Sequence, residues 1–303
     1  MKFGEYIRIC RERYGLTQSA LVDLLYGFHD IFSGLDMVTL SRWERNVTAP
    51  NIERQRYFIE AMQEFEPRIF PAFDAIDMAA IEAAIFERGI QRTIGKHKRF
   101  ILNFPSQIIE EDALQVEPLH LWEEREPVLK IAHTFIHKVT QNQTDIPMER
   151  FATWVAHPST LFLVASYHRQ FFGMLISLRL KPEIFEKLMH FEMEEKEIVP
   201  AHFADENEEG CAYPLSMLAY TEQCATLLAL RYYQYLMEKE KTTDYVGSRP
   251  KLKEGGELAK TLGLSLFQVA PDKSARTFRA NINDVLLNRY VLTLIFKESN
   301  QIQ

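Results

Sequence analysis

Two short amphipathic segments near the start of the chain constrain its fold more than any other feature. Leu16 to Leu25 has the sequence LTQSALVDLL, and Asp36 to Arg45 has DMVTLSRWER. Apolar residues recur in both segments at spacings of three and four, which indicates helices with one packed face. The connector holds Gly27, Ser33 and Gly34, residue types that favour turns. The sequence therefore predicts a helix, a turn and a second helix that pack together.

The second predicted helix has two faces of different character, and Asp36 is placed to cap its N-terminus. The face expected to pack inward carries Leu40, Trp43, Glu44 and Val47. The opposite face carries Val38, Ser41, Arg42 and Arg45. Because a large aromatic residue anchors one face, we expect the other face to be free to contact a partner.

These segments resemble the N-terminal domain of the phage-repressor-like helix-turn-helix family, also called the Cro/C1 or XRE family. The resemblance covers about residues 1 to 64 and depends on RICRERYG, LTQSAL and TLSRWERN followed by TAPN. It implies an all-α domain that places its second helix in the major groove of double-stranded DNA. The chain departs from the family in its longer connector and in Asn46, which replaces the usual Gly and still suits a left-handed helix end.

The resemblance also implies roles for single residues. Gln18 would hold a DNA phosphate, and Glu44 would pair with Arg11 of the preceding helix. Arg42 would face the bases, because its planar fork of donors suits guanine edges and phosphates. The implied DNA-contacting residues are Gln18, Ser19, Met37, Val38, Thr39, Ser41, Arg42, Arg45 and Asn46.

The charge distribution is compatible with such a domain. The chain has a net charge of -7, but residues 1 to 60 carry eight Lys or Arg and eight Asp or Glu. The acidic excess therefore lies downstream, where salt screens it beyond roughly 8 to 10 Å. A weakly charged reading domain predicts modest affinity per monomer, which favours a homodimer on two half-sites.

Composition excludes several other classes. With 47% hydrophobic and 25% charged residues, the 303-residue chain is typical of globular protein and long enough for two domains. Its longest apolar runs, TLFLVASY and YVLTLIF, are too short to span a bilayer, and its first residues lack the basic, apolar, small-residue order expected of a signal peptide. We therefore expect a cytoplasmic protein without a membrane partner.

Metal and disulfide chemistry is not expected from the sequence. Cys10, Cys211 and Cys224 form an odd set without CxxC spacing, which is typical of buried thiols. His133 and His137 lie four residues apart on a predicted helix, but no third ligand is close in sequence. The acidic run EMEEKE, residues 192 to 197, is interpreted as a solvated face.

A shift in composition divides the chain at EFEPRIFP, residues 64 to 71. We predict a DNA-binding domain over residues 1–66, a connecting helix or linker over 67–94 that acts as a spacer or a dimerisation element, and an α/β (α+β) domain over 95–303. The elements expected in the last part are a strand at 97–105, helices over 120–141, a strand hairpin over 160–180, a helix at 180–192, a strand at 211–220, a helix at 221–239, a strand at 244–247, a helix at 254–262 and strands at 278–284 and 291–296.

This order resembles the GCN5-related acyltransferase (GNAT) fold over about residues 95 to 300. That family's signature is Arg or Gln, two residues, Gly, any residue, and Gly or Ala, and its glycines let backbone N–H groups cradle the coenzyme A pyrophosphate. The matching junction here is YTEQCATLL, which has no glycine and no basic residue and carries Glu222. The departure argues against coenzyme A as a cofactor and against acetyl transfer.

Several polar side chains would lie near the cleft where such a fold holds its ligand. They are Tyr213, Ser216, Tyr220, Tyr232 and Tyr233. They are interpreted either as core and cleft-wall residues or as the lining of a pocket for a small-molecule effector.

The function predicted from these patterns is a sequence-specific transcriptional regulator. Its C-terminal domain would be non-catalytic and would bind an effector or mediate dimerisation. Two alternatives stay open: an active acyltransferase with a DNA-targeting module, and an antitoxin or phage-type repressor that binds a protein partner.

Overall fold

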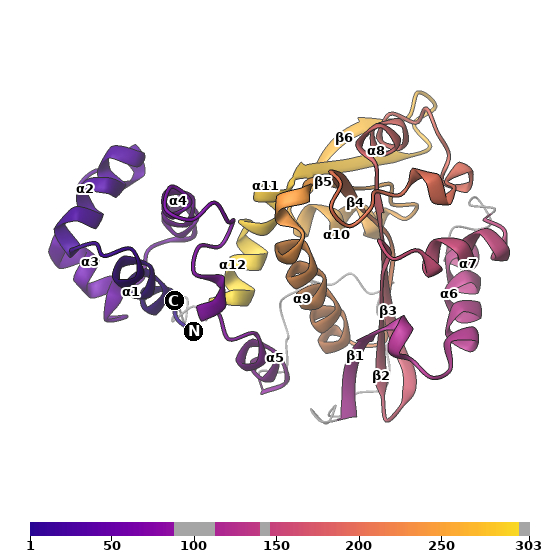
Figure 1. Cartoon of the computed structure of the whole chain (residues 1–303), viewed down its shortest axis with the longest axis horizontal. Helices are drawn as coiled ribbons and strands as arrows, with labels where there is room; N and C mark the ends of the chain where they lie inside the picture. Colours follow the sequence, from indigo (N-terminus) through magenta and orange to yellow (C-terminus); the bar gives the residue numbers. More distant parts are fainter. Residues whose placement is uncertain (88–112, 140–145, 297–303) are drawn as a thin grey trace. The chain divides into compact units, whose positions relative to one another are not determined.

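The computed structural model describes residues 1–87, 113–139 and 146–296, and the chain forms two compact units (Figure 1). The first, here called the helical unit, comprises Met1–Ile81 and Leu286–Gln303. The second, here called the sheet unit, comprises Glu82–Val285. Each unit is described by itself.

Side-chain caps fix where the helices of the helical unit begin. Thr17, Asp36, Asn51 and Asn288 each accept a hydrogen bond from the backbone N–H three residues on. The helices are α1 (Phe3–Arg13), α2 (Gln18–Phe28), α3 (Met37–Glu44), α4 (Ile52–Met62) and α12 (Arg289–Ile295), with 3-10 turns at Asp30–Phe32 and Phe73–Ala75. The predicted helix, connector and second helix are thus present as α2, a 3-10 turn and α3.

The core of the helical unit gathers one face of α1 against the other helices. Tyr6, Ile7 and Cys10 of α1 are fully buried. Phe296, which follows α12, places its ring 4.8 Å from that of Phe3 and 5.0 Å from that of Tyr6. Phe296, the last described residue, therefore belongs to the same core as helix α1.

One prediction about the C-terminal part of the chain is wrong. Residues 291–296 were expected to form a strand, and the structure has helix α12 there, capped by Asn288. A short apolar run is compatible with a strand and with a buried helix. Here the Asn288 cap and the packing against α4 favour the helix. The domain expected over 95–303 stays a prediction, and the sheet unit itself runs to Val285.

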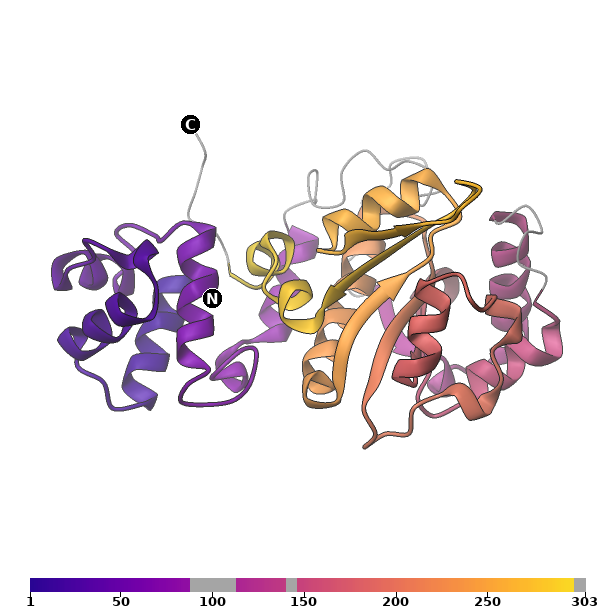
Figure 2. The same ribbon diagram turned by 90° about the horizontal axis from the view of Figure 1, so that it is seen from above.

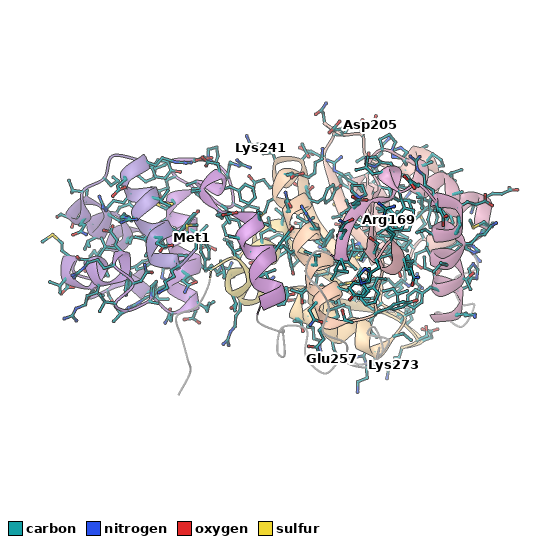
Figure 3. The ribbon with its side chains drawn as sticks, turned by 90° about the horizontal axis from the view of Figure 1, so that it is seen from below. Met1, Arg169, Asp205, Lys241, Glu257 and Lys273 are labelled. Atoms are coloured by element: carbon teal, nitrogen blue, oxygen red, sulfur yellow. The ribbon has the colours of Figure 1, made fainter. Side chains whose placement is uncertain are left out.

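The sheet unit contains a seven-stranded mixed sheet. Its spatial order is β1 (Leu114–Pro118), β2 (Leu161–Tyr167), β3 (Gln170–Leu180), β4 (Gly210–Ala219), β5 (Thr243–Ser248), β7 (Arg276–Asn281) and β6 (Ser265–Val269). All neighbouring strands are antiparallel except β4 and β5, which are parallel. The predicted hairpin turns at His168 and Arg169, whose φ values of 49° and 62° fit a two-residue hairpin turn; Arg169 is labelled in Figure 3.

Helices cover both faces of this sheet (Figure 1). One face packs against α6 (Arg125–Val139), α7 (Met148–Ala156) and α8 (Pro182–Met189), and α9 (Glu222–Glu238) packs on the other. Helix α10 (Lys253–Thr261) contacts β6 and β7 (Figure 2). Alternate residues of β3, such as Met174, Ile176 and Leu178, enter the core under α6 to α8. The mixed α/β class predicted for this part is confirmed.

Other elements differ from the prediction. Strands β1 and β6 were not predicted, and the expected strand at 97–105 lies outside the described residues. The helix expected before it is seen as α5 (Met78–Glu87), and a short helix α11 (Ile282–Leu286) follows β7. None of the helices in the described residues has the length and apolar character required to cross a bilayer.

Candidate functional site

Strands β4 and β5 diverge in the middle of the sheet. They pair in parallel at Gly210 with Thr243 and at Ala212 with Val246, and within these two fully described strands the pairing stops there. β4 continues to Ala219 along β3. Among the described residues, the edge of β4 that faces away from β3 therefore has no strand partner from residue 213 onward.

A β-bulge lies at the same place. Ser216 pairs with Ile176 and Pro214 with Ser177, so Leu215 has no opposite residue on β3. Proline suits this position because it has no N–H to give to a ladder. Bulges bend a strand and redirect its side chains, and they are frequent beside functional sites. Residues 214–217 are accordingly only half-buried in an otherwise buried strand.

A cavity of about 150 Å³ occupies the divergence. Phe135 and Ile136 of α6 contribute from one face of the sheet, and Tyr232 and Tyr233 of α9 contribute from the other. Its remaining apolar lining comes from Leu175, Pro214, Leu215, Met217, Val246, Leu252, Leu258, Ala259, Leu262, Leu264 and Val285. The cavity thus has lining residues from elements on both faces of the sheet and is mostly apolar.

A buried carboxylate forms the polar part of the wall. Glu195 is only 4% exposed, and it lies in a 3-10 turn, Glu195–Glu197, between α8 and β4. The hydroxyl of Tyr213 donates a hydrogen bond to its Oε1, and Nζ of Lys251 lies 3.2 Å from its Oε2. Burial, followed by the charge of Glu195, raises the pKa of Tyr213, so the phenol stays a proton donor to the carboxylate.

A second ion pair stands beside the first. The guanidinium of Arg249 donates to both carboxylate oxygens of Glu194 at 3.1 and 3.2 Å, and it lies 4.8 Å from the ring centre of Phe191. Arg249 and Lys251 both line the cavity. The residues that follow β5 therefore bring two cations to one end of an apolar cavity, each held by an acidic residue.

Three of the five residues expected near a ligand cleft line this cavity. Ser216, Tyr232 and Tyr233 line the cavity, and Tyr213 lies behind Glu195. Tyr220 instead packs on Phe172, with ring centres 5.3 Å apart, and it is not among the lining residues. The interpretation of residues 192–197 as a solvated face is wrong at Glu195, which the Tyr213 hydroxyl and the Lys251 ammonium enclose.

The junction between β4 and α9 does not form a phosphate cradle. The hydroxyl of Thr221 accepts the N–H of Cys224 at 3.2 Å, which uses one donor of the first helical turn. Cys224 is buried beside Gly173, where an added Cβ would approach its sulfur to 2.7 Å. Glu222 occupies the first turn of α9. A diphosphate would meet an acidic side chain there, so this junction does not fit the pyrophosphate of coenzyme A.

A second candidate site lies on α3 of the helical unit. Met37 and Val38 are 55% and 58% exposed, and Arg42 and Arg45 are exposed as well. Leu40, Trp43 and Glu44 are buried on the opposite side. Val47, expected on the packed face, is 65% exposed, because α3 ends at Glu44 and Asn46 turns the chain with a φ of 56°.

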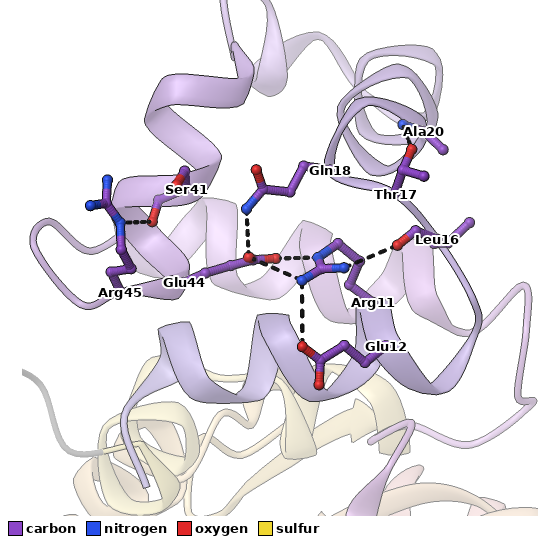
Figure 4. Close-up of polar contacts among 9 residues, drawn as sticks. All are labelled: Arg11, Glu12, Leu16, Thr17, Gln18, Ala20, Ser41, Glu44 and Arg45. Carbon is purple, nitrogen blue, oxygen red and sulfur yellow. Dashed lines mark hydrogen bonds and ion pairs between the residues drawn. The ribbon is translucent and has the colours of Figure 1, made fainter.

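Polar contacts hold α3 against α1 and α2 (Figure 4). Nε of Arg11 lies 2.5 Å from Oε1 of Glu44, and Nε2 of Gln18 donates to Oε2 of Glu44 at 2.8 Å. Arg45 donates from its Nε to the carbonyl of Ser41 at 3.2 Å. Ser19 is exposed, and the N–H of Thr39 is capped by Asp36. The Gln18 amide, expected to hold phosphate, is thus engaged with Glu44.

Sequence comparison identifies no relative of the chain. A scan against protein-family models gave no match, and a search of curated proteins gave none either.

Solved structures match part of the chain. FeeM, an N-acyl amino acid synthase from uncultured soil microbes, is 14% identical over 56% of this chain and 91% of its own, with a TM-score of 0.38. An aminoglycoside 6'-acetyltransferase of type Ii is 13% identical over 55% and 97%, with a TM-score of 0.36. A GNAT-family acetyltransferase from Staphylococcus aureus Mu50 is 9% identical over 56% and 99%, with a TM-score of 0.38. The likeness is one of fold only, and it transfers no substrate to this chain.

Proposed function

We propose that the sheet unit binds an acyl group in the cavity between β4 and β5 and transfers it from a thioester to an amine. The observation that carries this proposal is the cavity itself, which lies where the two strands diverge and is lined by elements of both faces of the sheet. On this proposal a donor would approach from one face and an acceptor from the other. Acyl transfer needs such an arrangement, because the two substrates must meet at one carbon atom.

The lining favours an aliphatic or similarly apolar acyl group. Side chains such as Leu258 and Leu262 of α10 and Met217 of β4 offer no hydrogen bonds to a polar chain. A volume of about 150 Å³ matches the engineered protein cavity that holds a benzene-sized ligand. Apolar pockets of this kind bind by removing hydrocarbon from water.

Glu195 is the residue that we assign to proton transfer. In the proposed step the amine nitrogen attacks the thioester carbonyl carbon, the C–N bond forms and the C–S bond breaks. The nitrogen loses a proton to the Glu195 carboxylate, and the thiolate leaves and takes up a proton. Tyr213 and Lys251 would hold the carboxylate in one orientation, and the bound amine would have to lie within hydrogen-bond reach of it.

The donor would not be selected by phosphates. Because Glu222 and Thr221 occupy the start of α9, the usual diphosphate contacts have no counterpart at that junction. A thioester without phosphates should therefore serve as well as a coenzyme A thioester. This expectation separates the proposal from ordinary acetyl-coenzyme A chemistry.

Acyl thioesters of N-acetylcysteamine test the proposal, with hydroxylamine as a small nucleophile. We expect thiol release and hydroxamate formation that depend on acyl-chain length. Glu195→Gln should lower kcat by about 10²- to 10⁴-fold, the usual contribution of a general base. Glu192→Gln, an exposed neighbour, is the matched control and should leave kcat unchanged. Absence of turnover with every chain length, or full activity of Glu195→Gln, would contradict the proposal.

DNA binding by the helical unit is the second proposed function, favoured by the exposed side of α3. Two large apolar residues, Met37 and Val38, stand exposed beside Arg42, whereas Trp43 anchors the buried side. Apolar contacts with thymine methyl groups and Arg contacts with guanine would use this face. On this proposal the chain is a regulator that carries an acyl-binding unit, and a homodimer would contact two half-sites.

Selection of bound fragments from genomic DNA, followed by titration, tests this second function. Arg42→Ala should weaken binding to the selected site by roughly 10- to 100-fold, the value of one good base contact. Arg8→Ala, on the exposed side of α1, is the control and should leave binding near the wild-type value. Equal DNA affinities of the wild type, Arg42→Ala and Arg8→Ala would exclude DNA binding through α3.

A further inference from the structure

We propose a binding site for a divalent transition metal between α6 and the start of α7, formed by His133, His137 and the backbone carbonyl of Ile146. The inference does not depend on the proposed acyl transfer or on DNA binding. In the sequence, no third ligand is close to His133 and His137. The structure supplies an oxygen atom at the required place.

The three groups converge on one point. His133 and His137 lie four residues apart on α6, so their side chains share one face of the helix. Their Nε2 atoms are 3.1 Å apart. The carbonyl oxygen of Ile146 lies 2.8 Å from Nε2 of His133 and 3.0 Å from Nε2 of His137. Ile146 is buried and immediately precedes Pro147, the N-cap of α7.

Hydrogen bonds alone do not account for all three distances. If both Nε2 atoms carry protons, each donates to the Ile146 oxygen, and two donors then face each other at 3.1 Å. If only one Nε2 carries a proton, that N–H can donate to the other Nε2 or to the Ile146 oxygen. The unprotonated Nε2 and the Ile146 oxygen then face each other with a lone pair on each atom. A cation placed above the plane of the three atoms, about 2.1 Å from each, would be attracted by all of them at once.

The size of the triangle indicates the coordination geometry. Ligand atoms about 2.1 Å from a shared metal lie about 3.0 Å apart at right angles and about 3.4 Å apart at tetrahedral angles. The three observed separations, 2.8 to 3.1 Å, match right angles. They would therefore occupy one face of an octahedron, with water at the remaining positions.

The donor set indicates the class of metal. Two imidazole nitrogens suit zinc, nickel, cobalt or copper, whereas magnesium and calcium prefer oxygen alone. No group of three His, Cys, Asp or Glu side chains in the described ranges is placed to hold a metal, so the carbonyl of Ile146 is the third protein ligand proposed here. Nickel, which accepts six ligands, is a suitable probe.

Metal binding would link the site to the cavity. Helix α6 contacts α7 through His133. The ring centre of His133 lies 5.6 Å from the ring centre of Phe151 on α7. Helix α6 also presents Phe135 and Ile136 to the cavity. A metal joined to the Ile146 carbonyl would fix α6 to the start of α7, and through α6 it would stabilise one wall of the cavity.

Calorimetric titration of the tag-free, chelator-treated full chain with Ni²⁺ tests the proposal. We expect one site per chain and a rise in the temperature of unfolding, because the metal binds the folded state. His133→Ala and His137→Ala should each weaken binding by at least roughly tenfold, since even residues outside the ligand shell contribute 10- to 100-fold. His120→Ala, an exposed histidine of the same unit, is the control and should bind like the wild type.

The absorption spectrum of the Co²⁺-loaded wild-type chain gives a second readout that needs no variant. Weak d–d bands that are shifted from those of Co²⁺ in buffer alone would indicate six-coordinate, protein-bound cobalt and support the site. The intense bands of tetrahedral cobalt would overturn the proposed geometry. Nickel affinity that is the same in the wild type and in folded His133→Ala and His137→Ala, or no binding at millimolar Ni²⁺, would overturn the site itself.

Discussion

Glu44 on α3 accepts a hydrogen bond from the guanidinium of Arg11 on α1, with 2.5 Å between Arg11 Nε and Glu44 Oε1. Gln18, the first residue of α2, donates to the other carboxylate oxygen. The hydrogen bond to Glu44 is the main cause that raises the pKa of Arg11, so the guanidinium stays charged. One buried carboxylate therefore joins the three helices that position the exposed face of α3.

Removal of this carboxylate should destabilise the helical unit. Glu44→Ala leaves the Arg11 charge, only 17% exposed, without its buried partner, and such losses cost about 3 kcal/mol or more. We expect a lower urea midpoint for the helical unit in equilibrium unfolding. Glu12→Ala, which removes an exposed carboxylate 3.6 Å from the same Arg11, should change stability by less than about 1 kcal/mol. Equal effects of the two substitutions would contradict this account.

Acid should weaken the helical unit through Asp74. The two Nη atoms of Arg13 donate to Asp74, at 2.7 and 2.8 Å, and this contact lowers the pKa of Asp74 below its usual value of about 3.9. The folded state thus binds a proton less readily than the unfolded state. The stabilisation is present above the unfolded pKa and is lost as the pH falls through the lower, folded pKa.

Asp74→Asn should therefore reduce the acid-dependent part of unfolding below about pH 4. The temperature of unfolding, monitored by circular dichroism between pH 2.5 and pH 7, measures this acid dependence. The wild type and the variant should differ at pH 7 and converge at the acidic end. A difference that stays constant over the whole range would show that Asp74 contributes by something other than its charge.

The cysteines should be unreactive in the folded chain. Cys10, Cys211 and Cys224 are all buried, and burial raises the pKa of each thiol to about 12. Since the thiolate is the reactive form, a maleimide at pH 8 should label none of them in the native protein and all three after denaturation. Mass spectrometry counts the labels. Rapid labelling of Cys224 without denaturant would show that the junction between β4 and α9 opens.

Enlarging a side chain in the cavity should change acyl-chain preference. Ala259 on α10 is buried and lines the cavity, so Ala259→Phe would fill space that we assign to the acyl chain. We expect activity with long-chain thioesters of N-acetylcysteamine to fall while short-chain activity remains. Far-UV circular dichroism checks that the variant folds, since overpacking also destabilises cores. An unchanged chain-length profile would place the acyl group elsewhere.

Local features of the fold were accessible from the sequence. Thr17, Asp36 and Asn51 each precede a helix and cap it, because a short polar side chain at that position satisfies a free backbone N–H. The turn at His168 and Arg169 separates two apolar runs, which is the usual pattern of a hairpin. Such features depend on neighbours within a few residues, so the printed sequence contains them.

The candidate site depends on distant neighbours, and the sequence indicates it only in part. Glu195 lies in an acidic run that suggests solvent, yet Tyr213 and Lys251, 18 and 56 residues further on, bury it. The divergence of β4 from β5 has no local signature except Pro214 at the bulge. Helix α12 was mistaken for a strand because a seven-residue apolar segment fits either structure until its packing partner is known.

The most direct test of the central claim is photocrosslinking with an acyl thioester of N-acetylcysteamine that carries a diazirine in its chain. After irradiation and proteolysis, mass spectrometry identifies the labelled peptides. The account predicts label on residues 214–217 of β4 or 252–262 around α10, removed by excess non-photoreactive thioester. Label spread over other surfaces, or label that excess thioester does not remove, would contradict an acyl-binding cavity between β4 and β5.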